Sequence, residues 1–353
     1  MSPINERRLE LFKSNRRGYY SFWIFLVLFV ASMFAEFIAN DKPIVFSHQG
    51  ELHFPLFAMY TETQLGGVLE TEADYRDPYV ADLIDADGWA LWPPVRYSYN
   101  TVDYSYEITP SPPDSRHFLG TDGGGTDVFA KLLYGFRLSV LFGLALTLIS
   151  SGIGVLVGAV QGYFGGLIDL LGQRVVEIFA GLPILFVLII LASIVEPNVF
   201  WLLGILGLFS WMALVGVVRA EFLRARNYEF VLAARSLGVS NLTILRRHVL
   251  PNAMVATLTY LPFILNGSIT ALTALDFLGF GLPIDSPSLG RLLSSAKANL
   301  QAPWLGFFVF VTLAMLLTLL IFIGEAVRDA LDPRRAVATR SDPGAELVNP
   351  QTA

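Results

Sequence analysis

The chain has 353 residues, of which 54% are hydrophobic and only 15% are charged, with a net charge of −6. A water-soluble protein of this length would need many more polar residues to cover its surface, so the composition favours an integral membrane protein. Because the sequence contains no cysteine, disulfide frameworks, thiolate zinc sites and cysteine nucleophiles are excluded.

Six stretches are long and apolar enough to be membrane spans, since about 20 mostly apolar residues in a helix cross the ~30 Å of hydrocarbon. We therefore predict an all-α integral membrane fold with six transmembrane helices. The predicted spans are Tyr20–Ala39, Leu138–Phe164, Val175–Val195, Phe200–Val218, Ala253–Leu275 and Trp304–Ala326. The length of the first span and its lack of a small-x-small cleavage site favour an uncleaved signal anchor over a cleaved signal peptide.

The distribution of lysine and arginine around the spans predicts their orientation. Residues 1–19 contain five basic and two acidic residues, residues 40–117 contain four and 13, and residues 219–250 contain six and two. We expect residues 1–19, the loop 219–252 and the tail 327–353 in the cytoplasm, and the acidic loop 40–117 outside. Arg328, Arg334 and Arg335 in the tail agree with this orientation.

The acidic loop 40–117 is too long for a simple connection. It is either a solvated cap without a task or a surface that docks or gates something arriving from outside, and the sequence leaves both alternatives open. His48 and His53 lie close together in this loop, but no third ligand is evident, so they are interpreted as a surface pair and no metal site is predicted.

Residues 118–140 (FLGTDGGGTDVFAKLLYGFRLSV) predict a glycine turn that leads into an amphipathic helix. A phosphate cradle is disfavoured because no Lys-Ser or Lys-Thr follows at P-loop spacing. We expect an interfacial elbow helix that enters the second span. Lys131 and Arg137 would reach toward lipid headgroups from it.

The basic loop 219–252 predicts two helices separated by a turn. The first helix ends at Gly238 as a C-cap, Ser240 or Asn241 caps a second short helix, and Pro251 ends that helix before the fifth span. The apolar residues expected on one side of the first helix are Phe222, Leu223, Phe230, Val231, Ala234 and Leu237. The less favoured alternative, on local physics alone, is a basic loop that lies on anionic lipid and serves only to fix the topology.

The sequence has no G-x-x-x-x-G-K-[ST] and no H-E-x-x-H, so it contains no recognisable P-loop or zincin site. The remaining candidate is Asp276, at the predicted exit of the fifth span. An acid in this position marks a gate or substrate path, or it is capped by nearby backbone groups.

Residues 232–252 (LAARSLGVSNLTILRRHVLPN) resemble the coupling-loop signature of the membrane subunits of ABC transporters. That signature reads Glu-Ala-Ala, three residues, Gly, nine residues, then Ile-x-Leu-Pro. Ala233, Ala234 and Gly238 match it, whereas Leu232 replaces the glutamate and His248 the isoleucine, as in the dipeptide/oligopeptide branch. The segments 119–139, 275–290, 302–306 and 327–334 resemble that branch as well.

The resemblance implies a type I ABC importer transmembrane domain, acting in the bacterial inner membrane as a permease subunit for peptides or peptide-like compounds of the microcin C type. Alternatives are an ion-coupled secondary transporter or a permease for another small solute, such as a nickel chelate. The chain would bind no cofactor or nucleic acid and would not itself be an enzyme. Its implied partners are a homologous second permease subunit, two ATPase domains carrying ATP and Mg²⁺, a periplasmic substrate-binding protein, the peptide substrate and membrane lipid.

The same resemblance implies which residues couple the chain to the ATPase, with Asp276 kept as a possible gate or path residue. The expected coupling residues are Ala233, Ala234, Arg235, Leu237, Gly238, Arg246, Arg247, His248, Leu250 and Pro251.

Overall fold

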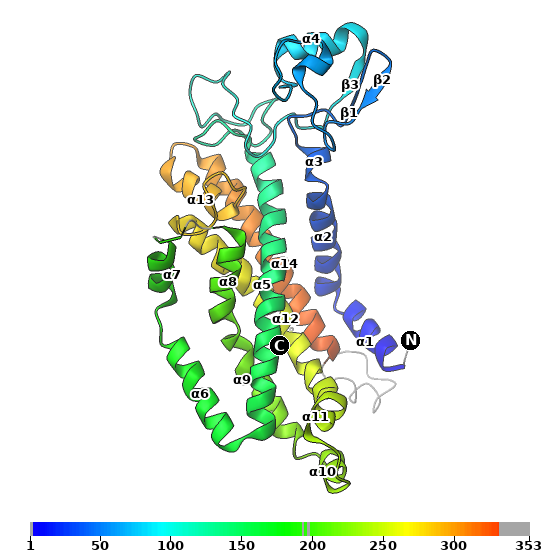
Figure 1. Cartoon of the computed structure of the whole chain (residues 1–353), viewed down its shortest axis with the longest axis vertical. Coiled ribbons are helices and arrows are strands. Elements are labelled where there is room, and N and C mark those ends of the chain that lie inside the picture. Colours follow the sequence, from blue (N-terminus) through cyan, green and yellow to red (C-terminus); the bar gives the residue numbers. More distant parts are fainter. Residues whose placement is uncertain (1–2, 193, 196–197, 332–353) are drawn as a thin grey trace, which may run out of the picture.

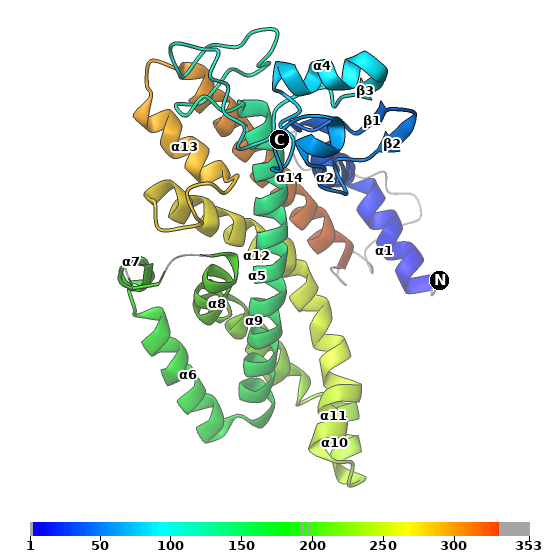
Figure 2. The ribbon, with the colours of Figure 1, turned by 45° about the horizontal axis from the view of Figure 1, so that its top comes forward.

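The computed structural model describes residues 3–192, 194–195 and 198–331, so Arg334 and Arg335 and the tail from residue 332 onward lie outside the described residues. It is an elongated helical body with a small domain at one end and two short helices, α10 and α11, at the other (Figure 1). We call residues 40–127 the loop domain. Figure 2 shows α5 running along the centre of the body between α14 on one side and α8 and α9 on the other.

The helices of the body follow the predicted spans in order, with different ends. They are α1 (Pro3–Ser14), α2 (Arg16–Met33), α3 (Ala35–Ile38), α5 (Val128–Phe164), α6 (Gly166–Ala180), α7 (Ile184–Ala192), α8 (Val199–Ser210), α9 (Met212–Ala225), α10 (Glu229–Ser236), α11 (Asn241–Ile244), α12 (Leu250–Leu278), α13 (Leu289–Ala298) and α14 (Pro303–Leu331). In the described part of the chain, three helices are long and apolar enough to cross a membrane: α5, residues 257–278 of α12, and α14. Two bent pairs of helices, α6 with α7 and α8 with α9, raise the number of candidate spans to five if each pair is one span. Because α2 begins with Arg16 and Arg17, it is not among these, so the first predicted span does not meet this test.

Two of the predicted straight spans are bent. The third is a pair, α6 and α7, that meets at 66°, and the fourth is a pair, α8 and α9, that meets at 41°. Proline has no N–H and its ring clashes with the preceding turn, so Pro183 ends the helical ladder between α6 and α7. The second bend lies at Trp211, and α9 continues past the predicted end of the span to Ala225.

The predicted elbow helix is wrong, because residues 128–164 form one continuous helix, α5. Gly135 does not bend it; its missing side chain admits Leu289 of α13, whose nearest side-chain atom would lie 3.1 Å from an added Cβ. The two basic residues of this segment have acidic partners within the chain. Lys131 pairs with Asp122, and Arg137 makes two hydrogen bonds of 2.8 and 2.9 Å to Glu36.

The loop domain corrects the all-α prediction, because it contains an antiparallel sheet in the order β2-β1-β3. The strands are β1 (Val45–His48), β2 (Glu51–His53) and β3 (Trp89–Leu91), accompanied by the 3₁₀ helix η1 (Glu62–Leu65) and α4 (Pro78–Asp87). Gln49 and Gly50 both have positive φ and form the tight turn between β1 and β2. The loop domain has its own core, made of Phe46, Leu65, Ala73, Tyr75, Val80 and Ile84. His48 is buried, so the predicted surface pair of histidines is wrong as well.

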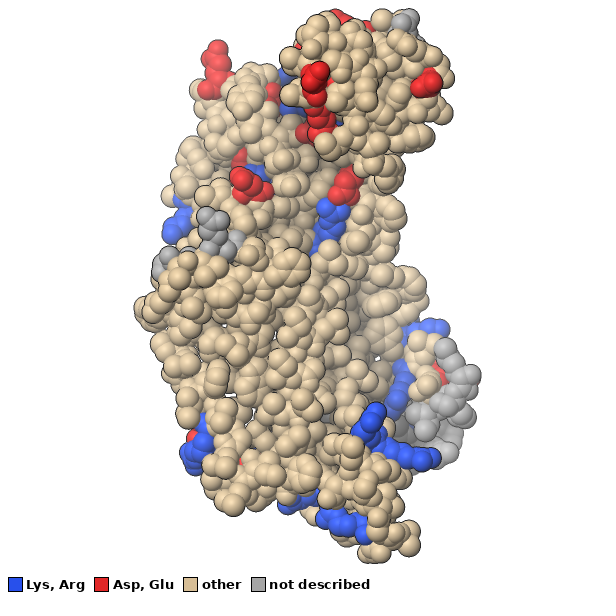
Figure 3. Space-filling model, viewed as in Figure 1, with Lys and Arg blue, Asp and Glu red and all other residues tan. Residues whose placement is uncertain are grey.

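Charged side chains lie at the two ends of the molecule and leave a broad band between them nearly uncharged (Figure 3). Acidic side chains lie mainly on the loop-domain end in this view, and basic ones at the opposite end. Both ends of the described chain meet at that opposite end, where the Asn15 side-chain amide donates to Asp329 over 3.4 Å. A band of apolar surface between charged ends is the pattern expected of a membrane protein.

Candidate functional site

The segment between α9 and α12 forms the end of the molecule farthest from the loop domain (Figure 1). We call residues 226–249 the tip. Within it, α10 and α11 are joined by a turn at Gly238, whose φ is +76°. The Gly238 N–H donates to the carbonyl of Arg235 (3.0 Å) and the Val239 N–H to that of Ala234 (3.1 Å). This is the Schellman pattern, which needs a left-handed residue, so Gly238 is a helix C-cap as predicted.

Two other details of the predicted tip are wrong. The first helix is interrupted between Ala225 and Glu229, so α9 and α10 are separate. The second helix does not end at Pro251, because a π-helical turn, η2 (Leu245–Val249), carries the chain from α11 directly into α12. Pro251 lies in the first turn of α12, where a missing N–H costs little.

The base of the tip is a packed apolar cluster. Val231 from α10, Ile244 from α11 and Val249 from η2 are fully buried, and they pack with Phe222 and Ala225 of α9. Ala234 lies partly buried against this cluster, and the predicted burial of Phe222 and Val231 is confirmed. The tip is therefore a structured extension of α9 and α12 rather than a loose loop.

One buried side chain of α5 holds the tip from the other side. The Tyr163 hydroxyl donates to Oδ1 of Asn241 over 3.0 Å, and the Arg235 guanidinium carbon lies 5.6 Å from the centre of the Tyr163 ring. Sequence reasoning missed the contact between Tyr163 and Asn241 because the two residues are 78 positions apart, and neither occupies a fixed position of the coupling-loop signature.

The outer surface of the tip is apolar and uncovered. Leu237 is 83% exposed and Leu242 64% exposed, and Phe230 and Leu232 are about half exposed. We call these four residues the tip patch. The prediction that Phe230 and Leu237 pack with Phe222 is wrong, because the break after Ala225 turns α10 and the helical period does not continue across it. Large apolar side chains grouped on an exposed end mark an interaction surface.

Most of the remaining predicted coupling residues are exposed as well. Ala233, Arg235, Gly238, Arg246, Arg247 and Pro251 are exposed, whereas His248 and Leu250 are half-buried. The His248 ring lies 6.5 Å from that of Phe230. A Cβ added at Gly238 would meet no atom within 4 Å, so the space beside this turn is open.

Asp276 lies at the opposite end of α12 and is fully buried. It accepts a hydrogen bond from the Leu282 N–H (2.7 Å) and another from the Ser288 hydroxyl. Gly281 and Gly290 press against it so closely that a side chain at either position would collide with it. These contacts agree with the capped-acid alternative: Asp276 holds the loop between α12 and α13, and in this conformation it faces no open path.

Comparison with known proteins identifies the kind of chain to which this tip belongs. Residues 125–337, more than half of the chain, match the family described as the inner membrane component of binding-protein-dependent transport systems. The chain belongs to this family.

Several curated relatives of this permease are transport proteins. The chain is 57% identical to the inner membrane ABC transporter permease protein YejE of Escherichia coli K12, over 96% of this chain and 99% of that protein. It is 54% identical to the peptidoglycan transport system permease protein YejE of Agrobacterium fabrum C58, over 95% and 94%. It is 35% identical to the oligopeptide transport system permease protein OppC of Haemophilus influenzae, over 67% and 77%. The family match begins at residue 125, so most of the loop domain lies outside it.

In this permease the tip is joined to the helical body by close packing of α9 on α5. Gly154, Gly158 and Gly162 form a stripe along α5 that faces α9. An added Cβ at Gly158 would lie 2.8 Å from Cβ of Val218, and one at Gly162 would lie 2.7 Å from Cβ of Phe222. Small residues four apart allow two helix backbones to approach closely, which is a common basis of helix association in membranes.

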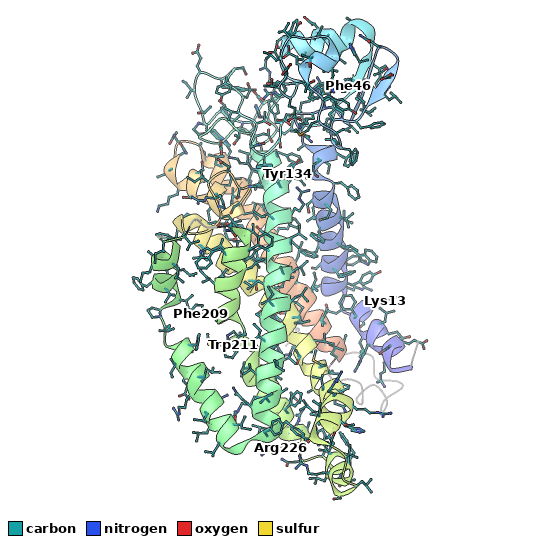
Figure 4. The ribbon with its side chains drawn as sticks, viewed as in Figure 1. Lys13, Phe46, Tyr134, Phe209, Trp211 and Arg226 are labelled. Carbon is teal, nitrogen blue, oxygen red and sulfur yellow. The ribbon has the colours of Figure 1, made fainter. Side chains whose placement is uncertain are left out.

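Two arginines extend this joint to α6. Arg219 of α9 pairs with Asp169 of α6, with 2.7 Å between Nη2 and Oδ2. Arg226, labelled near the lower end of α5 in Figure 4, follows α9 and lies against Gly165 in the turn between α5 and α6. The base of the tip is therefore connected to α5, α6 and α9 together.

Proposed function

We propose that this chain is the membrane-spanning permease subunit of an ATP-driven importer that carries peptides or peptide-like compounds, including those of the microcin C type. The observation that carries the proposal is the tip patch, an uncovered apolar surface mounted on a tightly packed base. The names of the relatives support the substrate class. The rival reading as an ion-coupled secondary transporter, or as a permease for a nickel chelate, has no comparable support among them.

In this proposal the chain crosses the bacterial inner membrane six times, and α2 with α3 forms the first crossing. The others are α5, the bent pair α6–α7, the bent pair α8–α9, α12 and α14. The tip and both chain ends face the cytoplasm, and the loop domain faces outside. The excess of basic residues in 1–19 and 219–250, and of acidic residues in 40–117, supports this orientation.

The tip transmits the conformational change. ATP and Mg²⁺ bind to separate ATPase domains, since the sequence has no recognisable P-loop. The tip patch lies in a cleft of an ATPase domain, with Arg246 and Arg247 beside it for pairing with carboxylates. Exposed ion pairs contribute only ~0–1 kcal/mol each, so the apolar contact supplies most of the attachment. When the ATPase domains close, the tip moves with them and carries α5 and α9.

The complete transporter contains further subunits. A homologous second permease subunit supplies the other half of the path, and a periplasmic binding protein delivers the peptide. This division of labour makes the chain a transport component rather than an enzyme.

The docking role is tested by changing the tip patch. In Leu237→Ser we expect co-purification of the ATPase subunit to fall and substrate-stimulated ATP hydrolysis to be lost, with normal insertion of the permease. Leu300→Ser is the matched control, because Leu300 is equally exposed but lies between α13 and α14, away from the tip. Full coupling in Leu237→Ser, or equal losses in both variants, would contradict the proposal.

The orientation is tested by single cysteines, which need no other change because the sequence has none. An impermeant maleimide added to intact spheroplasts should label Tyr104→Cys in the loop domain and should not label Ser240→Cys at the tip. Both residues are exposed. The reverse labelling pattern would overturn the orientation.

A further inference from the structure

One segment of the loop domain differs from its surroundings in charge. Residues 52–61 (LHFPLFAMYT) contain no Asp, Glu, Lys or Arg, although residues 40–117 carry 13 acidic residues. Within it, Phe57 is 77% exposed and Met59 75% exposed, and Phe54 is about half exposed. Exposing apolar side chains to water is unfavourable, so a group of them on the surface of the loop domain indicates contact with something other than water.

The segment lies over the end of α3, the helix that continues α2. The centre of the Phe57 ring is 6.4 Å from that of Phe37 on α3, and Phe37 in turn lies 6.2 Å from Phe34. Phe34 and Phe37 are themselves exposed. These ring contacts join Phe34, at the end of α2, to Phe37 and Phe57, and the exposed Phe54 and Met59 lie in the same segment as Phe57. The five residues form an apolar surface next to the end of α2. We call it the aromatic patch.

The length of α2 places the aromatic patch at a membrane boundary. Its 18 residues rise ~27 Å at 1.5 Å per residue, which is close to the ~30 Å of the hydrocarbon layer. Because Arg16 and Arg17 begin the helix at one membrane surface, Phe34 and Phe37 lie at the other. The nearby Glu36–Arg137 ion pair is also suited to the headgroup layer, where charges remain solvated.

Several backbone N–H groups of the segment are hydrogen-bonded within the segment itself. The N–H groups of Phe57 and Ala58 donate to the carbonyl of Phe54, over 3.0 and 3.1 Å. The N–H of Phe54 donates to the Tyr60 hydroxyl over 3.3 Å, and Pro55 has no N–H. Since unsatisfied N–H groups are costly in lipid, this internal pairing lowers the cost of inserting the segment.

We propose that residues 54–59 insert into the lipid leaflet next to the loop domain and hold that domain against the membrane surface beside α2. The occupant of the aromatic patch is lipid, because the patch lies next to the end of a spanning helix. The inference rests on the membrane placement of α2 in the proposed function, but not on peptide transport or on which side the loop domain faces.

The test places nitroxide spin labels on single cysteines in the full-length chain, assembled with its transporter partners in vesicles of phosphatidylethanolamine and phosphatidylglycerol. Labels at Phe57→Cys and, independently, Met59→Cys should collide more with oxygen, which concentrates in lipid, than with a water-soluble nickel chelate. Val68 (79% exposed) and Tyr104 (90% exposed) are matched controls in the same domain, and their labels should favour the nickel chelate.

The alternative occupant is a protein, and the same labels identify it. If positions 57 and 59 behave like 68 and 104 in vesicles, the proposal is wrong. If they become shielded only when the substrate-binding protein is added, the aromatic patch is a protein docking surface instead of a lipid anchor. If the labels at 57 and 59 favour oxygen but the assembled complex does not transport peptides, the proposed function is wrong and the lipid contact of the aromatic patch still holds.

Discussion

The Tyr163 hydroxyl on α5 donates a 3.0 Å hydrogen bond to Asn241 at the start of α11. This contact joins the end of a membrane helix to the tip, and Tyr163 is only 3% exposed. Since α5 also packs against α9 along the glycine stripe, the tip is attached to α5 both directly and through α9. We therefore expect the packing of this joint to matter for transport as well as the tip patch.

Removing the Tyr163 hydroxyl should weaken the attachment of the tip to α5 but should not abolish it. In Tyr163→Phe the ring remains for Arg235, and the loss of one hydrogen bond costs ~0.5–1.5 kcal/mol. We expect a partial fall in substrate uptake per ATP hydrolysed in vesicles, with unchanged subunit assembly. Tyr228→Phe, on the exposed side of the tip, is the control and should retain normal uptake. Equal uptake in Tyr163→Phe and the wild type would show that the bond has no part in coupling.

The glycine stripe predicts a sharp difference between two positions on α5. Gly158→Ala should lower the stability of the detergent-purified protein by ~1–3 kcal/mol, because overpacking forces α9 away. An added Cβ at Gly158 lies 2.9 Å from the carbonyl oxygen of Val215, whereas one at Gly152 meets nothing within 4 Å. Gly152→Ala on the same helix should therefore be neutral or slightly stabilising. Thermal denaturation of the two variants decides the point, and equal shifts would contradict the packing argument.

The turn at Gly238 is sensitive to backbone conformation rather than to space. Its φ of +76° costs a residue with a Cβ roughly 1–2 kcal/mol, although the space around it is open. Gly238→Ala should reduce ATPase coupling, and Gly238→Asn should reduce it less because asparagine tolerates this region better. The measurement is substrate-stimulated ATP hydrolysis. A smaller effect of alanine than of asparagine would refute the conformational explanation.

A buried histidine predicts a pH dependence in the loop domain. His117 lies 2.7 Å from Asp127, the N-cap residue of α5, and 3.3 Å from Asp103. Burial alone would lower the pKa of His117, but the hydrogen bonds to the two carboxylates outweigh it and raise that pKa. A raised pKa in the folded state stabilises the protein fully below the ordinary histidine pKa of ~6.5. This stabilisation is lost as the pH rises through the folded-state pKa.

We therefore expect the apparent unfolding temperature of the wild type to fall as the pH rises above ~6.5. His117→Gln should be less stable at low pH and should show a flatter profile. His53→Gln is the control, because His53 is outside this cluster and stacks on Phe46 instead. Parallel profiles for wild type and His117→Gln would rule out this role of the charged imidazole.

Some features of the site could be read from local residues. The αL turn at Gly238 and the burial of Val231 depend on nearby sequence, and both are found. The exposure of Leu237, the direction of Phe230 and the contact of Tyr163 with Asn241 could not be predicted, because they depend on the break after Ala225 and on where α5 ends. The elbow helix failed for a related reason: the amphipathic pattern of residues 118–140 does not show that α5 continues without a break, with Gly135 in contact with Leu289 of α13.

The sequence by itself determined the membrane class, the order of the apolar helices, the segregation of charge along the chain and the position of the basic segment between the fourth and fifth spans. These properties follow from composition and local period, which act over a few helical turns. Only the tertiary structure decided the bends in the third and fourth spans, the sheet of the loop domain, the burial of Asp276 and the exposed side of the tip. They result from contacts between residues far apart in the chain, where close packing admits one arrangement and no local pattern records it.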